Sequence, residues 1–126
     1  MPQKNKILVV DDESSNCEML KDFLASRFEG KVEVEVAYNG KEAVEKIEQS
    51  PQPDCVFLDI QMPVMDGLQV LKLLQPKYPD IKFIMVTAND SVSKMMDSMM
   101  NDAFDYVPKP INFDVLEEKI LSALGQ

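Results

Sequence analysis

Five polar side chains lie just after short apolar runs of the sequence: Asp11, Asp12, Asp59, Thr87 and Lys109. The first two acids follow Ile7–Val10 and the third follows Cys55–Leu58, whereas the threonine follows Phe83–Val86 and the lysine comes two residues after Val107. If these runs are parallel strands of one open sheet, their carboxyl ends form its ligand-binding edge. We therefore expect three carboxylates, one hydroxyl and one ammonium group to converge in one crevice.

Three carboxylates in one crevice require a positive partner. At a separation of about 4 Å and an effective dielectric constant near 20, each pair of carboxylates costs about 4 kcal/mol. One lysine cannot balance three negative charges, so either a carboxyl group is protonated or a cation binds. A small divalent cation that prefers oxygen ligands fits best, which predicts Mg²⁺, with Mn²⁺ as a substitute that accepts the same ligands.

Each of these residues has a simpler explanation when it is taken alone. Asp12 could be only a helix cap, Thr87 only a turn residue, and Lys109 only a solvated charge. Their joint placement after neighbouring strands favours a functional site over these separate explanations.

The composition excludes several other kinds of function. The chain has 126 residues, with 22 acidic and 13 basic side chains, a formal net charge of −9 and no histidine. A Ser-His-Asp triad, a histidine-liganded zinc site and a phosphohistidine of its own are therefore excluded. Cys17 and Cys55 are too few for a four-cysteine zinc site, and we expect them to be reduced, buried thiols.

Charge and hydropathy also bear on partners and location. An acidic surface is a poor match for nucleic acid, so we expect no direct nucleic-acid binding. No apolar run approaches the roughly 20 residues of a membrane span, and the apolar run Ile7–Val10 is too short for a signal peptide. These observations predict a cytoplasmic location without membrane binding.

Short apolar runs alternate with helical patterns along the whole chain. Strands are expected at Ile7–Val10, Val32–Val36, Cys55–Leu58, Phe83–Val86 and Phe104–Val107. Strict alternation of valine and glutamate in the second run predicts an edge strand with one solvent-exposed face. Helices are expected to begin at polar caps: Ser15 in a capping box with Glu18, Asn39, Asp66, Asp90 or Ser91, and Asn112.

Five strand–helix repeats with short connections predict an α/β fold with a parallel sheet covered by helices on both faces. Right-handed crossovers leave few topologies, of which the doubly wound, flavodoxin-like order 2-1-3-4-5 is a common solution. The length leaves room for one domain, so we expect a single (βα)₅ domain over residues 1–126.

The chain resembles the receiver domain of two-component response regulators in four motifs. These are Ile7–Glu13, Leu58–Gly67, Val86–Ala88 and Asp105–Pro110, which occur in the order and at the spacings of that family. The stretch Asp59-Ile60-Gln61-Met62-Pro63-Val64-Met65-Asp66-Gly67 is highly specific. The resemblance covers essentially the whole chain.

The resemblance implies a phosphorylation-dependent signalling switch rather than a turnover enzyme. Asp59 would accept a phosphoryl group from a phosphohistidine on a sensor histidine kinase or a histidine phosphotransfer protein. Asp12, Asp59 and the backbone carbonyl of Gln61 would hold Mg²⁺, and Asp11 would assist through a bound water. The output would act on a downstream protein target or effector domain.

The resemblance also assigns roles to residues around the acceptor. Lys109 would pair with the phosphoryl group and Thr87 would hydrogen-bond one of its oxygens. Tyr106 would be the switch aromatic, changing the surface made by the fourth helix, fifth strand and fifth helix. The remaining matched positions have conformational roles: Pro63, which fixes φ, Gly67, which allows flexibility at the entry to the third helix, and Pro110, whose preceding peptide bond is usually cis in this family.

One departure from the family pattern concerns the end of the fourth helix. Many members have Gly-Ala before the fifth strand, where this chain has Asp102-Ala103. The connection out of that helix is therefore expected to differ in shape.

Two alternative functions use the same residue types. One is a Mg²⁺-dependent phosphatase with an aspartyl-phosphate intermediate, although such enzymes place the nucleophile after the first strand in an Asp-x-Asp motif, and here Asp11 and Asp12 are adjacent. The other is a binding module that never carries phosphate, against which the presence of all the key residues argues. The sequence fits a free-standing regulator and a receiver segment of a longer protein equally well.

Overall fold

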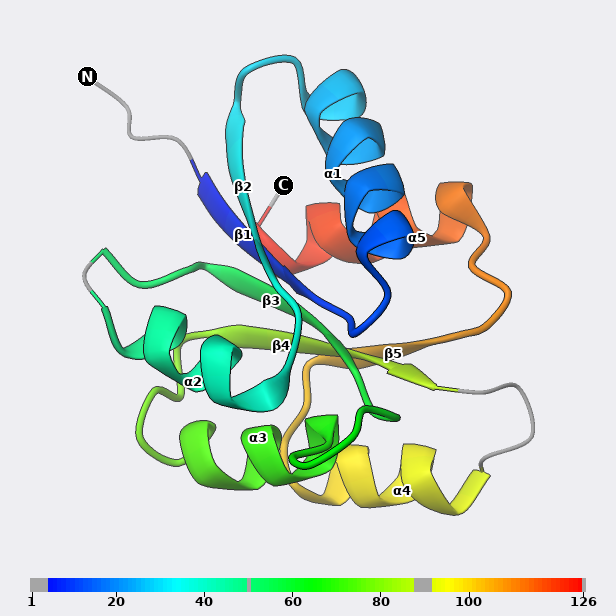
Figure 1. Ribbon diagram of the computed structural model, residues 1–126. Coiled ribbons are helices and arrows are strands. Elements are labelled where there is room, and N and C mark those ends of the chain that lie inside the picture. Colours follow the sequence, from blue (N-terminus) through cyan, green and yellow to red (C-terminus); the bar gives the residue numbers. More distant parts are fainter. Residues whose placement is uncertain (1–4, 50, 88–91, 126) are drawn as a thin grey trace.

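Short buried strands alternate with helices throughout residues 5–49, 51–87 and 92–125, which the computed structural model describes (Figure 1). The strands are β1 (Asn5–Val10), β2 (Val32–Ala37), β3 (Cys55–Asp59), β4 (Lys82–Thr87) and β5 (Asp105–Pro108). The helices are α1 (Ser14–Phe28), α2 (Gly40–Glu48), α3 (Gly67–Leu74), α4 (Val92–Met100) and α5 (Phe113–Ala123). Each predicted strand is present, with ends that differ by no more than two residues from those expected.

The strands form one parallel sheet in the order β2-β1-β3-β4-β5, which confirms the predicted topology. β2 lies at one edge, as its alternating sequence indicated, and Glu33 on this strand is exposed. β3 is buried at every residue because it lies inside the sheet and helices cover both of its faces. The order of the strands also places β1 beside β3, so the two acidic strand ends are neighbours.

Two apolar layers enclose the sheet, one on each face. On one face, α1 and α5 pack against strand residues such as Val9 and Phe57. On the other face, side chains of α2 and α3 pack against residues such as Leu58 and Met85, and Figure 1 shows α4 on this same side. Successive strand residues point to opposite faces, so a continuous apolar run is needed to serve both layers. This layering holds the strand ends at a fixed edge.

The predicted helix caps are mostly confirmed. The Asn39 side chain accepts a hydrogen bond from the Glu42 N–H, and the Asn112 side chain caps α5 in the same way. Asp66 caps α3 in a capping box that is completed by Gln69. Asp90 and Ser91 lie outside the described residues.

The predicted capping box at Ser15 is wrong. α1 begins one residue earlier, at Ser14, and its N-cap residue Glu13 makes no side-chain capping bond. The Glu13 carbonyl instead accepts backbone hydrogen bonds from Asn16 and Cys17, so the helix starts directly from the turn after β1. The pattern Ser-x-x-Glu is a local signal, and here the tertiary position of that turn overrides it.

Two further expectations concern the cysteines and membrane helices. Cys17 and Cys55 are both free and buried, as predicted. In the part of the chain that the structure describes, no helix has the length and apolar character needed to cross a membrane.

Candidate functional site

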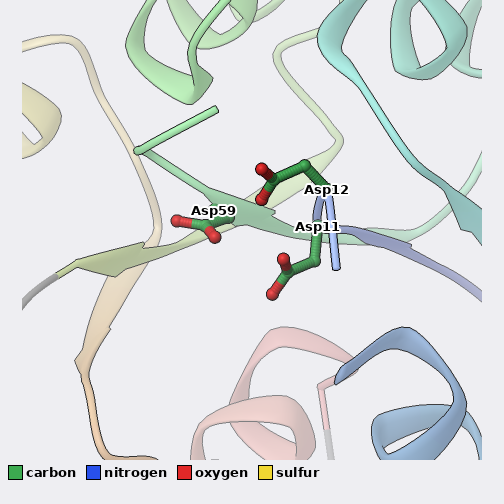
Figure 2. A group of neighbouring side chains, drawn as sticks. All are labelled: Asp11, Asp12 and Asp59. Atoms are coloured by element: carbon green, nitrogen blue, oxygen red, sulfur yellow. The ribbon is translucent and has the colours of Figure 1, made fainter. Parts of the chain in front are cut away.

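The carboxyl ends of β1 and β3 bring Asp11, Asp12 and Asp59 together (Figure 2). One carboxylate oxygen from each residue lies within 4.8 Å of the others. Asp11 and Asp59 are buried, whereas Asp12 is exposed. Among the described residues, this group offers only oxygen ligands, which suits a hard divalent cation.

Backbone hydrogen bonds continue the sheet beyond the strand ends and set the positions of the site residues. The Asp11 N–H donates to the Ala37 carbonyl at 3.1 Å, and the Ile60 N–H donates to the Val86 carbonyl at 2.9 Å. After the end of β5, the Lys109 N–H donates to the carbonyl of Thr87 at 2.8 Å. These bonds hold the chain in register just where the polar side chains emerge.

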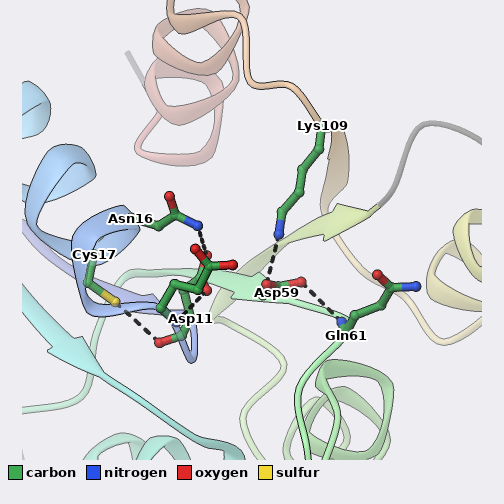
Figure 3. Close-up of polar contacts among 7 residues, drawn as sticks. Asp11, Asn16, Cys17, Asp59, Gln61 and Lys109 are labelled. Atoms are coloured by element: carbon green, nitrogen blue, oxygen red, sulfur yellow. Dashed lines mark hydrogen bonds and ion pairs between the residues drawn. The ribbon is translucent and has the colours of Figure 1, made fainter.

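Asp59 lies at the centre of the site and uses both carboxylate oxygens (Figure 3). Its Oδ2 accepts a hydrogen bond from Lys109 Nζ at 3.0 Å, and its Oδ1 accepts one from the Gln61 N–H at 3.0 Å. Burial raises the pKa of the Asp59 carboxyl, and the Lys109 hydrogen bond only partly opposes this effect. The nearby Asp11 charge raises the same pKa further. Keeping the Asp59 carboxyl ionised therefore costs free energy, and a bound cation would reduce that cost.

Lys109 is the cationic partner that the sequence indicated. Burial by itself lowers the pKa of the Lys109 ammonium, but the hydrogen bond and charge of Asp59 raise it above its ordinary value. Lys109 therefore stays protonated, and its charge points at the carboxylate of Asp59. Thr87 is buried at the end of β4, next to this pair in the backbone ladder.

Asn16 contributes to the site although the sequence gave it no such role. Its Nδ2 donates to Asp11 Oδ2 at 3.3 Å, while the Glu13 N–H donates to Asp11 Oδ1 at 3.0 Å. The Cys17 thiol donates to the Asp11 backbone carbonyl at 3.4 Å, and burial raises the pKa of Cys17 to about 11. Asp11 is thus held from three sides. The only signal in the sequence was the position of Asn16 in the first turn of α1, which alone indicates a solvated helix face.

The loop between β3 and α3, residues 60–66, is sharply folded. The Met65 N–H donates to the Pro63 carbonyl at 2.8 Å across Val64, whose φ of 69° is unusual for a β-branched residue. The Gly67 N–H donates to the Ile60 carbonyl at 2.9 Å and closes the loop.

The structure gives Gly67 a further role beside the flexibility expected of it, which stays a prediction. Its φ is not among the positive glycine values, and a Cβ atom at this position would lie 2.3 Å from the Asp59 carbonyl oxygen. Glycine is therefore needed for close approach to the acceptor strand, not for an unusual backbone angle.

The remaining predicted residues flank the site. Tyr106 is half-buried on β5 and packs against the core, and Lys119 Nζ lies 5.4 Å from the centre of its ring. The Lys109–Pro110 peptide bond is cis, as the family resemblance led us to expect. A groove of about 280 Å³ adjoins the site and is lined by Asp11, Asn16, Lys109 and Pro110 among others.

Comparison with known proteins identifies the family. Residues 7–121 match the family described as the response regulator receiver domain. This chain belongs to that family. Receiver domains of response regulators are phosphorylation-dependent signalling switches rather than metabolic enzymes, and response regulators interact with histidine kinases and effectors.

Curated proteins of similar sequence are also response regulators. The receiver domain is 39% identical over 119 residues to the response regulator MprA of Mycolicibacterium vanbaalenii, covering 94% of this chain and 50% of that protein. The chain thus spans about half the length of the curated relatives it matches.

Solved structures have the same fold. A CheY-like receiver domain protein from Methanospirillum hungatei superposes with a TM-score of 0.88 at 34% identity, covering 98% of this chain and 95% of that one. The chemotaxis protein CheY4 of Vibrio cholerae gives 0.85 at 28% identity, covering 96% and 99%. The receiver fold and its strand order are therefore shared along almost the whole chain.

Proposed function

We propose that Asp59 is the phosphoacceptor of this receiver domain. The observation that carries the proposal is the environment of its carboxylate: it is buried, lies 3.0 Å from Lys109 Nζ and belongs to a cluster with Asp11 and Asp12. A carboxylate oxygen of Asp59 attacks the phosphorus of a partner's phosphohistidine and forms an acyl phosphate. The P–N bond breaks, and its electron pair stays on the imidazole nitrogen, which takes up a proton.

The donor set fits Mg²⁺, and Mn²⁺ would accept the same ligands. Asp12, Asp59 and the backbone carbonyl of Gln61 would hold the ion, and Asp11 would contact it through water. When bound, the ion neutralises charge on the transferring phosphoryl oxygens. The buried, raised-pKa Asp59 and its anionic neighbours support this assignment, because a divalent cation offsets their mutual repulsion.

The other groups act on the phosphoryl oxygens. Lys109, already directed at Asp59, pairs with the new negative charge, and Thr87 hydrogen-bonds one oxygen from the end of the neighbouring strand. The acyl phosphate carries nearly two negative charges where the carboxylate carried one. Movement of Thr87 toward it, accompanied by rotation of Tyr106, would alter the surface of α4, β5 and α5 and change its affinity for a partner.

The family and the composition support the remaining assignments. The chain has no histidine, so the phosphoryl group comes from a sensor histidine kinase or a histidine phosphotransfer protein. With a net charge of −9, the chain's own output partner is a protein or effector domain rather than nucleic acid or a membrane. We propose one receiver domain over residues 1–126, working in the cytoplasm, with Pro63, Gly67 and Pro110 in conformational roles.

The direct test is the intact mass of the protein after incubation with acetyl phosphate and Mg²⁺. We expect a gain of one phosphate, about 80 Da, in the wild type. Asp59→Asn keeps the shape of the side chain but removes the nucleophile, so it should show no gain. Exposed Glu33 on the edge strand provides the control, because Glu33→Gln changes one acid away from the site and should be labelled like the wild type.

Other outcomes distinguish the two alternatives. No mass gain in the wild type, under conditions that label another receiver domain, favours a binding module that carries no phosphate. Steady turnover of a general phosphoester, blocked by Asp59→Asn, favours a phosphatase.

A further inference from the structure

The first residue of α2, Gly40, lies against the loop that follows the acceptor strand. Alanine is favoured over glycine within a helix by up to about 1 kcal/mol, so a glycine here needs another reason. The left-handed backbone region is not that reason, because the positive-φ glycines of the described chain are Gly30 and Gly125. Gly40 is instead fully packed, and the atoms that pack on it belong to Met65.

The contact between these two residues leaves no space for a side chain at position 40. A Cβ atom there would lie 2.5 Å from the Met65 carbonyl oxygen, 2.8 Å from its Cβ and 2.9 Å from its Cγ. Two of these three atoms are fixed to the backbone, so they cannot turn away as the end of a flexible side chain could. Any residue larger than glycine must therefore displace the loop or the helix.

The helix is held at its start and along its buried face. Asn39 Oδ1 accepts the Glu42 N–H at 2.8 Å, and Glu42 Oε1 accepts the Tyr38 N–H at 2.9 Å. These two bonds fix the first turn of α2. Buried Ala43 and Ile47 anchor the rest of the helix in the core. Because the helix resists displacement, part of the displacement would fall on the loop.

The loop transmits such a displacement toward the site because its other end is also fixed. Gly67 lies against the Asp59 carbonyl, where a Cβ would come within 2.3 Å, and its N–H holds the Ile60 carbonyl. Between the two glycine contacts lies Gln61, whose N–H donates to the Asp59 carboxylate. A groove of about 530 Å³, lined by Asp12, Gly40 and Met65 among others, joins this region to the acidic cluster.

We propose that Gly40 is a positioning residue: by seating Met65, it fixes residues 60–66 and thereby the place of the Gln61 backbone at the metal-binding edge. This inference rests on the proposed function, in which the Gln61 carbonyl is a ligand of Mg²⁺. Gly40 does not contact that ion; it acts through the loop.

The test compares Gly40→Ala with the wild type by two measurements. One is the amide resonances of Gln61 and Met65 in two-dimensional NMR spectra of the metal-free protein, and the other is the Kd for Mg²⁺ from calorimetry. We expect both resonances to shift and the Kd to rise about tenfold, as for other residues that support metal ligands indirectly. Position 30 provides the control, because a Cβ there meets nothing within 4 Å but the φ of 77° strains any side chain. Gly30→Ala should lower the Tm while leaving the Gln61 resonance and the Kd unchanged.

A second variant covers the case in which Gly40→Ala does not fold. Met65→Gly removes the two side-chain atoms that face Gly40 without crowding the core. It therefore loosens the contact between the loop and α2 in a folded protein. It too should shift the Gln61 resonance and weaken Mg²⁺ binding. Wild-type resonances and Kd in every variant that folds would overturn the inference. Absence of Mg²⁺ binding by the wild type would instead count against the proposed function. The Gln61 resonances would still show whether the packing of Met65 on Gly40 positions the loop.

Discussion

Two regions of the molecule depart from the usual rule that charged side chains are exposed and apolar ones buried. The carboxyl edge of the sheet buries charged residues, and the surface of α4 exposes apolar ones. At the edge, the charged residues Asp11 and Asp59 are only 5% and 2% exposed. On α4, the apolar residues Met96 and Met100 are 55% and 78% exposed. Burying charge and exposing apolar surface both cost free energy, and the proposed function supplies a ligand for each: a cation and a phosphoryl group at the edge, and a partner at the surface of α4.

The two regions differ in how firmly they hold their side chains. Both oxygens of Asp59 and both of Asp11 accept hydrogen bonds, so the carboxylates are oriented before any ligand arrives. The methionines of α4 have flexible side chains that can adapt to partners of different shape. Preorganised charge suits chemistry, and an adaptable apolar surface suits docking.

The largest expected effect separates a core methionine from an exposed one. Met85 is fully buried in the apolar layer that the sheet shares with α2 and α3, so Met85→Ala should lower the free energy of unfolding by about 2 to 5 kcal/mol through lost contacts and a cavity. Met100→Ala should change it by less than about 0.5 kcal/mol. Urea unfolding followed by circular dichroism measures both. Similar losses for the two variants would mean that α4 is a structural surface rather than a docking one.

The next effect concerns the charge at the sheet edge. Lys109→Met keeps the length of the side chain but removes the ammonium that lies 3.0 Å from Asp59. Phosphorylation by acetyl phosphate should slow about 100-fold, the loss typical of removing one donor that stabilises a transition state. Lys77, which pairs with Glu48 away from the site, gives the matched control Lys77→Met. Equal rates for the two variants would remove Lys109 from the mechanism.

A smaller effect follows from the raised pKa of Asp59. Because burial raises this pKa in the folded protein, the stabilisation present below the unfolded value near 3.8 is lost as the pH rises through the folded pKa. Asp59→Asn is neutral throughout, so without metal it should raise the Tm at pH 7 by about 3 °C and lose this advantage below about pH 3. Added Mg²⁺ should stabilise the wild type more than the variant. A lower Tm for the variant at pH 7 would show that the Lys109 pair outweighs burial.

The smallest effect concerns the C-terminal end of α4, just after its exposed methionines. Asp102 has a φ of 63°, and the bonds from Asp102 N–H to the Met99 carbonyl and from Ala103 N–H to the Ser98 carbonyl close the helix. Glycine adopts this backbone region without strain, so Asp102→Gly should stabilise the protein by about 0.5 kcal/mol, after allowance for its more flexible unfolded chain. Asp102→Ala should instead destabilise it. Thermal unfolding of both variants measures the sign, and two changes in the same direction would contradict this account.

The features that follow from local sequence were largely predictable. Continuous apolar runs marked β1, β3 and β4, the alternation of valine and glutamate marked β2, and the mostly apolar segment Phe104–Val107 marked β5. Asn39, Asp66 and Asn112 marked the starts of three helices correctly. The prediction of a capping box at Ser15 failed because that signal is local, whereas the turn after β1 determines where the helix begins. The difference in shape expected at Asp102 stays a prediction.

The sequence by itself determined the parallel sheet and which polar residues reach its carboxyl edge, because strand period and chain order dictate both. Only the tertiary structure decided how those residues are held. The Asn16 contact with Asp11 and the packing of Gly40 on Met65 join separate segments at atomic distances, which no local pattern encodes. The direction of the Asp59 pKa shift likewise depends on the burial of its carboxyl group, which exists only once the chain has folded.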